Sequence, residues 1–176
     1  TARHVIENCN SGRLASTSED TDLEELLVSQ EDDVAIVKSL PTTAPHFRFA
    51  EAPPPVGAMA YLFGFPQGGE YAVSVKLMAR ATARQGFRPY ASQPLLLWVE
   101  SGSMPGGTDE LSGMSGGPAL NSDGEVVGVF SASDLRRGRI VTANPWALAN
   151  YDKVIPQRGQ TLSRPIKGLP DAVTFL

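Results

Sequence analysis

The chain has 176 residues, of which 41% are hydrophobic and 19% are charged, and its formal net charge is −4. This length and composition allow one compact unit or two small units with a shared interface, and they supply enough apolar side chains for a packed core. The negative charge, together with the lack of a basic stripe interleaved with aromatic residues, argues against nucleic acid as a partner. No apolar run reaches the roughly 18 residues of a membrane-spanning helix, so no transmembrane segment is expected.

The composition favours β-structure. Seventeen glycines and fourteen prolines are spread along the chain, with short runs of Val, Ile and Leu between them. Such a pattern is typical of an all-β chain with many turns. The single cysteine, Cys9, can form no internal disulfide, and we expect a buried or partly exposed thiol rather than a nucleophile. No residue pattern indicates a metal ion or a cofactor.

The first third of the chain contains two segments of regular structure. Residues 23–28 (LEELLV) have helical propensity and helical spacing, so the residues alone favour a helix. Residues 33–38 (DVAIVK) form a short apolar run typical of a buried strand, with an aspartate at its mouth. Residues 44–57 are interrupted by four prolines and predict a linker.

The second part of the chain predicts further strands. Residues 71–77 alternate between apolar and polar side chains, and residues 95–99 form a short apolar run. The pair Asp123-Gly124 stands between two strand-like runs and predicts a hairpin. Residues 145–151 can begin a short helix, with Asn144 as its cap, and the Pro- and Gly-rich tail beyond residue 156 is expected on the surface.

The segment with the clearest chemistry is residues 113–118 (GMSGGP). A serine hydroxyl becomes a good nucleophile only when a base takes its proton and donors stabilise the oxyanion that forms. Glycines on both sides of Ser115 let the backbone bend so that successive N–H groups point at one position. A glycine-rich hairpin turn explains the same letters, and the choice depends on a suitable histidine and acid.

Candidates for the base and the acid are few. The chain has two histidines; His46 lies in a proline-flanked connector and is expected to be an ordinary histidine, which leaves His4. For the acid, Asp32 and Asp33 compete, and because neighbours on a strand face opposite sides, only one can point into a shared site. Both also belong to an acidic run over residues 19–33. The alternative interpretation is therefore that both aspartates are solvated surface acids without a catalytic role.

Taken together, residues 1–6 (TARHVI), 33–38 and 113–118 resemble the chymotrypsin-fold (trypsin-like) serine proteases, especially the bacterial HtrA-like branch without a PDZ domain. The order His, Asp, Ser is that of the family. Family motifs place the catalytic aspartate directly before an apolar-Ala-apolar strand, which selects Asp33 over Asp32. The resemblance covers about residues 1–145, and it implies a strand at residues 23–28.

The fold that the resemblance implies is all-β, with two six-stranded antiparallel β-barrels of the chymotrypsin type. Residues 1–50 would form the N-terminal barrel, which carries the histidine and the aspartate. Residues 51–176 would form the C-terminal barrel, which carries the serine, together with a C-terminal tail. Because His4 stands near the start of the chain, the first barrel lacks its N-terminal strands, and we expect an upstream N-terminal segment to supply them.

The function that the resemblance implies is a serine endopeptidase acting on protein or peptide substrates through an acyl-enzyme. His4 would be the base, Asp33 its orienting acid and Ser115 the nucleophile, with the N–H groups of Gly113 and Ser115 as the oxyanion hole. An extracytoplasmic bacterial location, periplasmic or secreted, follows from the same resemblance.

The resemblance also implies residues for substrate binding. Ser131 matches the family serine that bonds the catalytic aspartate, and Ser131, Ala132 and Ser133 would form an edge that pairs with the substrate backbone. Asp109 stands six residues before Ser115, where an aspartate selects basic side chains in digestive trypsin-like enzymes. An exposed loop acid is the alternative for Asp109.

Two other functions fit parts of the sequence. The first is a non-catalytic binding module that retains the protease fold. The second is an N-terminal-nucleophile hydrolase, in which Thr1 attacks and its own amine acts as the base.

Overall fold

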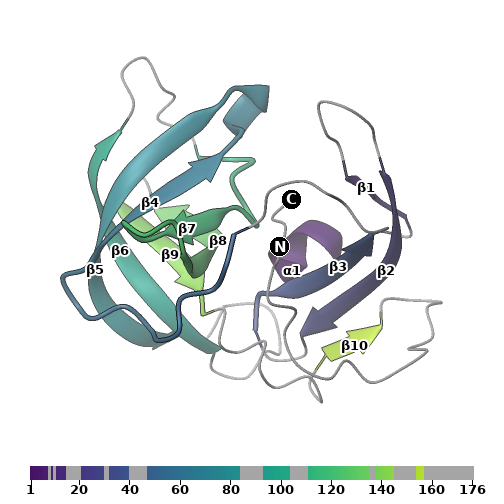
Figure 1. The fold of residues 1–176 in the computed structure, drawn as a ribbon, viewed down its shortest axis with the longest axis horizontal. Helices are drawn as coiled ribbons and strands as arrows, with labels where there is room; N and C mark the ends of the chain where they lie inside the picture. Colours follow the sequence, from purple (N-terminus) through teal and green to yellow (C-terminus); the bar gives the residue numbers. More distant parts are fainter. Residues whose placement is uncertain are drawn as a thin grey trace.

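The computed structural model describes residues 1–7, 9, 11–14, 21–29, 32–39, 47–83, 93–103, 111–134, 138–144 and 154–156. In Figure 1 these residues form two bodies, a β-barrel and a smaller sheet with one short helix. The smaller body contains α1 (Arg3–Ile6), β1 (Arg13–Leu14), β2 (Thr21–Ser29), β3 (Ala35–Ser39) and β10 (Val154–Pro156). The barrel contains β4 (Met59–Gly64), η1 (Pro66–Gly68), β5 (Tyr71–Ala83), β6 (Gln93–Ser103), β7 (Pro118–Leu120), β8 (Val126–Asp134) and β9 (Arg139–Ala143).

The smaller sheet is organised around β2, which pairs antiparallel with β1, β3 and β10. Residues 23–28 are therefore strand, as the resemblance implied, although their local spacing also fits a helix. Pairing with strands on both sides overrides the local propensity because it satisfies the backbone groups of β2. β10 comes from the far end of the chain, so this sheet contains strands from both ends of the described sequence.

The barrel closes through six antiparallel strands in the order β4-β5-β6-β9-β8-β7, with β7 returning to β4. This confirms the predicted six-stranded barrel in the second part of the chain. The predicted hairpin joins β7 and β8, where Gly124 adopts a φ of 77°. The Asn121 side chain accepts hydrogen bonds from the N–H groups of Asp123 and Glu125, at 3.0 and 2.8 Å, which stabilises the turn. For the first part of the chain, the described residues form a four-stranded sheet, and no closed barrel is formed there.

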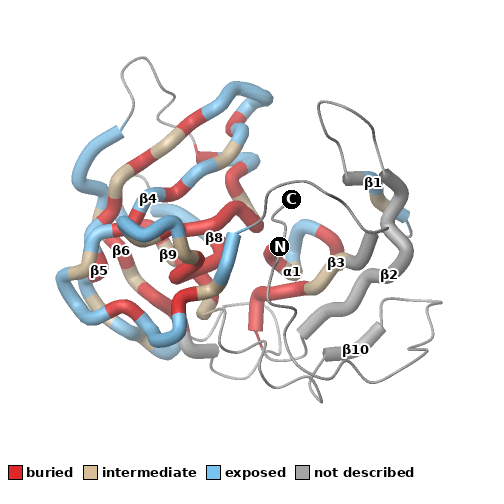
Figure 2. Tube along the Cα trace, viewed as in Figure 1, coloured by how far each residue is buried: buried red, intermediate tan, exposed pale blue. Residues whose placement is uncertain are grey.

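Alternation along the strands builds the barrel core. In β4, Ala60 and Leu62 point inward and are fully buried, whereas the residues between them face outward. Figure 2 shows buried stretches alternating with exposed ones along the barrel strands. Trp98 is fully buried, and its indole Nε1–H donates to Thr142 Oγ1 at 2.9 Å, which satisfies the one polar atom of this side chain.

Two sequence predictions, the short helix at residues 145–151 and the ordinary surroundings of His46, lie outside the described residues. Within the described part of the chain, no helix has the length and apolar character needed to cross a bilayer.

The bond between Trp98 and Thr142 is testable through stability. Trp98→Phe leaves the buried Thr142 hydroxyl without its donor, and we expect it to lower the free energy of unfolding by about 1–3 kcal/mol beyond the effect of lost volume. The double variant Trp98→Phe/Thr142→Val removes both partners and should recover part of that loss. A urea-unfolding double-mutant cycle measures the coupling, and strictly additive losses would contradict it.

Candidate active site

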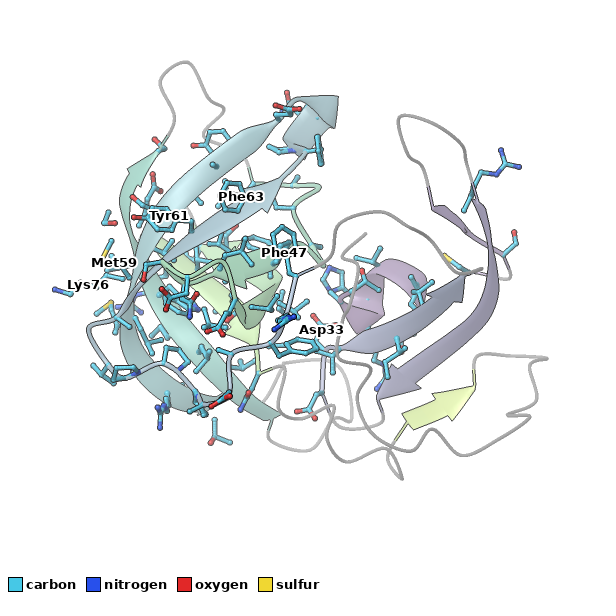
Figure 3. The ribbon with its side chains drawn as sticks, in the orientation of Figure 1. Asp33, Phe47, Met59, Tyr61, Phe63 and Lys76 are labelled. Carbon is cyan, nitrogen blue, oxygen red and sulfur yellow. The ribbon has the colours of Figure 1, made fainter. Side chains whose placement is uncertain are left out.

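The site is built around the buried carboxylate of Asp33, which is 5% exposed. Its Oδ1 accepts the backbone N–H of His4 at 3.0 Å, and its Oδ2 lies 2.8 Å from His4 Nδ1. Ser131 Oγ donates to the same Oδ2 at 2.5 Å. His4 belongs to α1 and Ser131 to β8, so the two bodies of the protein bond to one carboxylate between them. Asp33 is labelled in Figure 3.

Local packing places His4 and Asp33 opposite each other. Thr1 and Ala35 exchange two backbone hydrogen bonds, with Ala35 N–H to Thr1 C=O at 2.8 Å and Thr1 N–H to Ala35 C=O at 3.1 Å. Ile6 of α1 then packs on Ala35, which holds the short helix against β3. His4 lies between Thr1 and Ile6, and Asp33 lies two residues before Ala35. These contacts with Ala35 therefore bring the side chains of His4 and Asp33 together.

The residue after Asp33 anchors the strand to the barrel. Val34 is fully buried against Val129 of β8 and Ala143 of β9. A valine that is removed from water in this way contributes about 1.5–3 kcal/mol. Because Val34 and Asp33 point to opposite sides of the chain, one contact fixes the strand on the barrel and the other forms the site.

The hydrogen bonds to Asp33 determine its charge state. Burial by itself raises the pKa of a carboxyl group, because the ionised form loses its hydration. Here the side chain of His4, the hydroxyl of Ser131 and the backbone N–H of His4 all favour the ionised form, and together they bring the pKa of Asp33 below its usual value of 3.8. Asp33 is therefore an anion at neutral pH, and it accepts a hydrogen bond from the imidazole Nδ1 of His4.

This bond selects the tautomer of His4. A neutral imidazole that donates from Nδ1 carries its basic lone pair on Nε2. The His4 side chain is 36% exposed, so the ring lies at the surface of the site while its partner is buried. Asp32 is also buried, but His4 and Ser131 bond to Asp33.

Ser115 lies between two glycines with left-handed backbone, Gly113 at a φ of 97° and Gly116 at 88°. Only some of the N–H groups along this loop donate to acceptors within the protein. Those of Met114, Gly116 and Gly117 donate to the carbonyls of Leu111, Phe130 and Met114, at 3.1, 2.9 and 2.9 Å. Within the described residues, the N–H groups of Gly113 and Ser115 donate to no protein acceptor. The N–H groups of Gly113 and Ser115, which the resemblance implies as the oxyanion hole, are thus available to a ligand.

The Ser115 loop lies against the segment that carries His4. A Cβ atom placed on Gly116 would come within 2.2 Å of Thr1 Oγ1 and 3.0 Å of the Ala2 nitrogen. Gly117 approaches just as closely on the other side, where a Cβ would lie 2.5 Å from the Phe63 carbonyl oxygen. The sequence does not identify Thr1 as a packing partner, and the glycine pair Gly116-Gly117 is the one local signal of close backbone contact.

The residues predicted to bind substrate lie in or next to β8 where the structure describes them. Ser131 is buried, and its hydroxyl bonds to Asp33, whereas Ala132 and Ser133 are exposed at the end of β8. β7 pairs with β8 only as far as Val129, so the stretch from Ala132 to Asp134 extends beyond it. Asp109 lies outside the described residues, so its role in specificity stays a prediction. Cys9 is an exposed free thiol.

Comparison with known proteins identifies the family. Residues 1–129 match the family model of the trypsin-like peptidase domain, which is more than half of the chain. The chain therefore belongs to the trypsin-like peptidase family, and by class it is a serine endopeptidase. The sequence prediction of that family is confirmed. Among curated protein sequences, no significant match is found.

Solved structures agree on the fold. The active form of the Rv3671c protease from M. tuberculosis has a TM-score of 0.72 at 20% identity, over 95% of this chain and 70% of that one. The HtrA-type protease AlgW, solved with a tripeptide, has a TM-score of 0.66 at 17% identity, over 86% and 50%. A serine endoprotease from Yersinia pestis has a TM-score of 0.61 at 21% identity, over 86% and 51%. These likenesses establish a trypsin-like fold.

The contact of Gly116 with Thr1 predicts a sharp intolerance to a methyl group. Gly116→Ala places a Cβ atom inside the Thr1 side chain at an already unfavourable φ, so we expect a large loss of peptidase turnover and a lower melting temperature. Gly124→Ala is the matched control, since it has a similar positive φ of 77° but no atom within 4 Å of the new Cβ. Equal losses in both variants would show that φ, and not the contact, sets the requirement.

The lowered pKa of Asp33 predicts an acid-sensitive component of stability. A carboxyl group whose pKa is depressed on folding stabilises the native state above its unfolded pKa, near 3.8, and loses that contribution as the pH falls through the folded value. Urea unfolding between pH 7 and pH 2 should therefore show a fall in stability below about pH 4 that is smaller in Asp33→Asn. An identical pH dependence in the variant would contradict this assignment.

Proposed function

We propose that this chain hydrolyses peptide bonds through His4, Asp33 and Ser115, by way of an acyl-enzyme on Ser115. The observation that carries the proposal is the pairing of His4 Nδ1 with the buried Asp33 carboxylate, directly beside the loop that holds Ser115. A serine hydroxyl loses its proton at neutral pH only when an oriented base of this kind reaches it. The close approach of Gly116 to Thr1 and Ala2, next to His4, supports that encounter.

In the proposed reaction, His4 Nε2 takes the proton from Ser115 Oγ as this oxygen attacks the scissile carbonyl carbon. The tetrahedral intermediate collapses when the imidazolium gives the same proton to the leaving amine, which departs and leaves an ester on Ser115. A water molecule then repeats both steps and releases the acid. Throughout, Asp33 stays ionised and stabilises the imidazolium through Nδ1–H.

The oxyanion of each intermediate would be held by the N–H groups of Gly113 and Ser115. This assignment is supported by the hydrogen bonds of the loop: the N–H groups of Met114, Gly116 and Gly117 already donate to carbonyls, whereas those of Gly113 and Ser115 do not. Donors fixed in advance need no reorganisation during the reaction, and losing one typically reduces turnover by about 10²–10³.

The substrate backbone would pair with the end of β8. Ala132 and Ser133 are exposed there, beyond the last residue that pairs with β7. An extended peptide can add to such an edge and place its scissile carbonyl near the nucleophile loop, because Phe130 already bonds to Gly116 and Gly117. The preference for a particular side chain at the scissile bond, including a basic one bound by Asp109, stays a prediction.

We further propose that the four-stranded sheet and the closed barrel correspond to the two barrels of the chymotrypsin-type fold. Residues 1–50 form the first unit, and residues 51–176 form the second unit with a C-terminal tail, whose strand β10 returns to pair with β2 of the sheet. Support comes from the family match, which extends across both parts, and from the docking of Val34 on β8 and β9. The HtrA-type likeness also favours an extracytoplasmic bacterial location, periplasmic or secreted.

A fluorophosphonate probe tests the nucleophile. We expect one adduct on Ser115, lost in Ser115→Ala, because only a hydroxyl activated by His4 reacts at neutral pH. Asp33→Asn should reduce labelling and peptide turnover by about 10⁴, since the amide favours the wrong imidazole tautomer. Asp32→Asn is the matched control, because it makes the same change at the neighbouring buried acid and should retain most of the activity.

Other results separate the alternatives. Peptide binding without labelling or turnover would identify a non-catalytic binding module. An adduct on Thr1 would identify an N-terminal nucleophile. Equal losses in Asp32→Asn and Asp33→Asn would contradict the role given to Asp33.

A further inference from the structure

The outer face of β4 carries an unusual row of large apolar side chains. Met59, Tyr61, Phe63 and Phe65 occupy alternate positions along the strand and just beyond it, and each is between 43% and 62% exposed. Single exposed apolar residues are common, but a contiguous aromatic row on a barrel wall is not. In Figure 3, Met59, Tyr61 and Phe63 follow one another along β4. We call these four residues the β4 stripe.

One end of the stripe opens into a groove of about 540 Å³. Its walls are Met59, Tyr61 and the three prolines of residues 53–55. Arg80 Nη2 donates to the carbonyls of Pro53 and Pro54, at 3.3 and 2.8 Å, so the proline wall is tied to β5. The groove is therefore a formed feature of the barrel surface.

The charge inside the groove is negative. Among its lining residues, all of which are described, the charged ones are Glu51 and Glu125. Asn121 Nδ2 donates to the Glu125 carboxylate at 2.9 Å, which orients it. Among the described residues, three cations lie close by in sequence or register, and none of them lines the groove. Arg80 is engaged with the proline carbonyls, Lys76 stands opposite Met59 in the strand register, and the Arg48 carbonyl accepts the N–H of Val126, next to Glu125. A ligand with a basic group beside apolar groups complements this lining.

The other end of the stripe reaches the Ser115 loop. A Cβ on Gly113 would lie 3.4 Å from the Phe65 carbonyl oxygen and 3.4 Å from Pro66 Cα. β8 contacts the same loop through the bonds of Phe130 to Gly116 and Gly117. The loop is thus in contact with both β8 and the Phe65 end of the stripe, so a peptide whose acyl part pairs with β8 could carry its leaving-group side across the loop and over the stripe.

We propose that the β4 stripe and the groove bind the leaving-group side of an extended polypeptide substrate that carries apolar side chains and then a basic residue. This inference rests on the proposed peptidase function for the direction of the chain. From Phe65 to Met59 the strand rises by about 20 Å, so the basic residue would lie some six residues or more beyond the scissile bond. Binding here relies on side chains, because β4 is paired along its whole length with β5 and at Tyr61 and Leu62 with β7.

Equilibrium binding to the Ser115→Ala protein tests the proposal without requiring turnover. Two fluorescent peptides share the residues around the scissile bond, and the second continues for eight residues on the leaving-group side, with alternating Phe and a final Lys. We expect the longer peptide to bind about tenfold more tightly, and Tyr61→Ser with Phe63→Ser to remove that advantage. Met78→Ser is the control, because Met78 is 48% exposed on β5 but belongs to neither the stripe nor the groove.

A second comparison isolates the charge. Replacing the final Lys of the peptide with Glu, or making Glu51→Gln with Glu125→Gln, should weaken binding by about threefold, and high salt should abolish this difference. Glu100→Gln, an exposed strand carboxylate outside the groove, should have no effect.

Equal affinity for the two peptides, or an advantage that survives Tyr61→Ser with Phe63→Ser, would overturn the proposal. So would analytical ultracentrifugation showing a dimer that the same double variant converts to a monomer, because the stripe would then be an interface between copies. If the longer peptide binds as expected but the protein with Ser115 intact neither reacts with the fluorophosphonate nor cleaves the short peptide, the proposed function fails and the docking surface stands.

Discussion

The buried carboxylate of Asp33 is the constraint on which the rest of the site depends. A charge removed from water must be compensated by donors, and here the donors come from both bodies, His4 from α1 and Ser131 from β8. Neither body alone supplies the full set. Burial of this charge is therefore favourable only when the sheet and the barrel are docked, which links the formation of the site to the formation of the interface.

The same docking explains why small residues gather around Ser115. Gly116 touches the backbone of Thr1 and Ala2, and Gly117 touches that of Phe63. These contacts leave no room for a side chain on either residue, so two segments distant in sequence approach the backbone directly after the serine. The glycines thus do more than bend the loop, because they let the histidine-bearing segment approach it.

The residues of β4 alternate between the barrel core and the solvent-exposed β4 stripe. Its inward residues, Ala60 and Leu62, are fully buried and belong to the barrel core, while Met59, Tyr61 and Phe63 face solvent. Closing the barrel pairs β4 with β5 along its whole length and with β7 at Tyr61 and Leu62, so the outward side chains are not needed to hold the strand in place. A stable wall of this kind can carry apolar side chains on its surface, where they are available to an extended polypeptide.

Much of this protein was determined by the sequence alone. Short alternating runs, the Asp123-Gly124 turn and the three motifs around His4, Asp33 and Ser115 were enough to predict the all-β class, the strands and the family, because these features act over a few residues. Residues 23–28 show the limit of that range: their spacing fits a helix, and only pairing with β1, β3 and β10 makes them strand.

Tertiary structure decided the rest. Several of its features join residues that are far apart in the chain. Val34 packs on β8, Gly116 contacts Thr1, and the β4 stripe lies next to the groove. A local pattern states which face of a strand is apolar, but not which segment covers it. That choice depends on how the two bodies pack, since side chains and buried charges find their partners only after the chain has closed on itself.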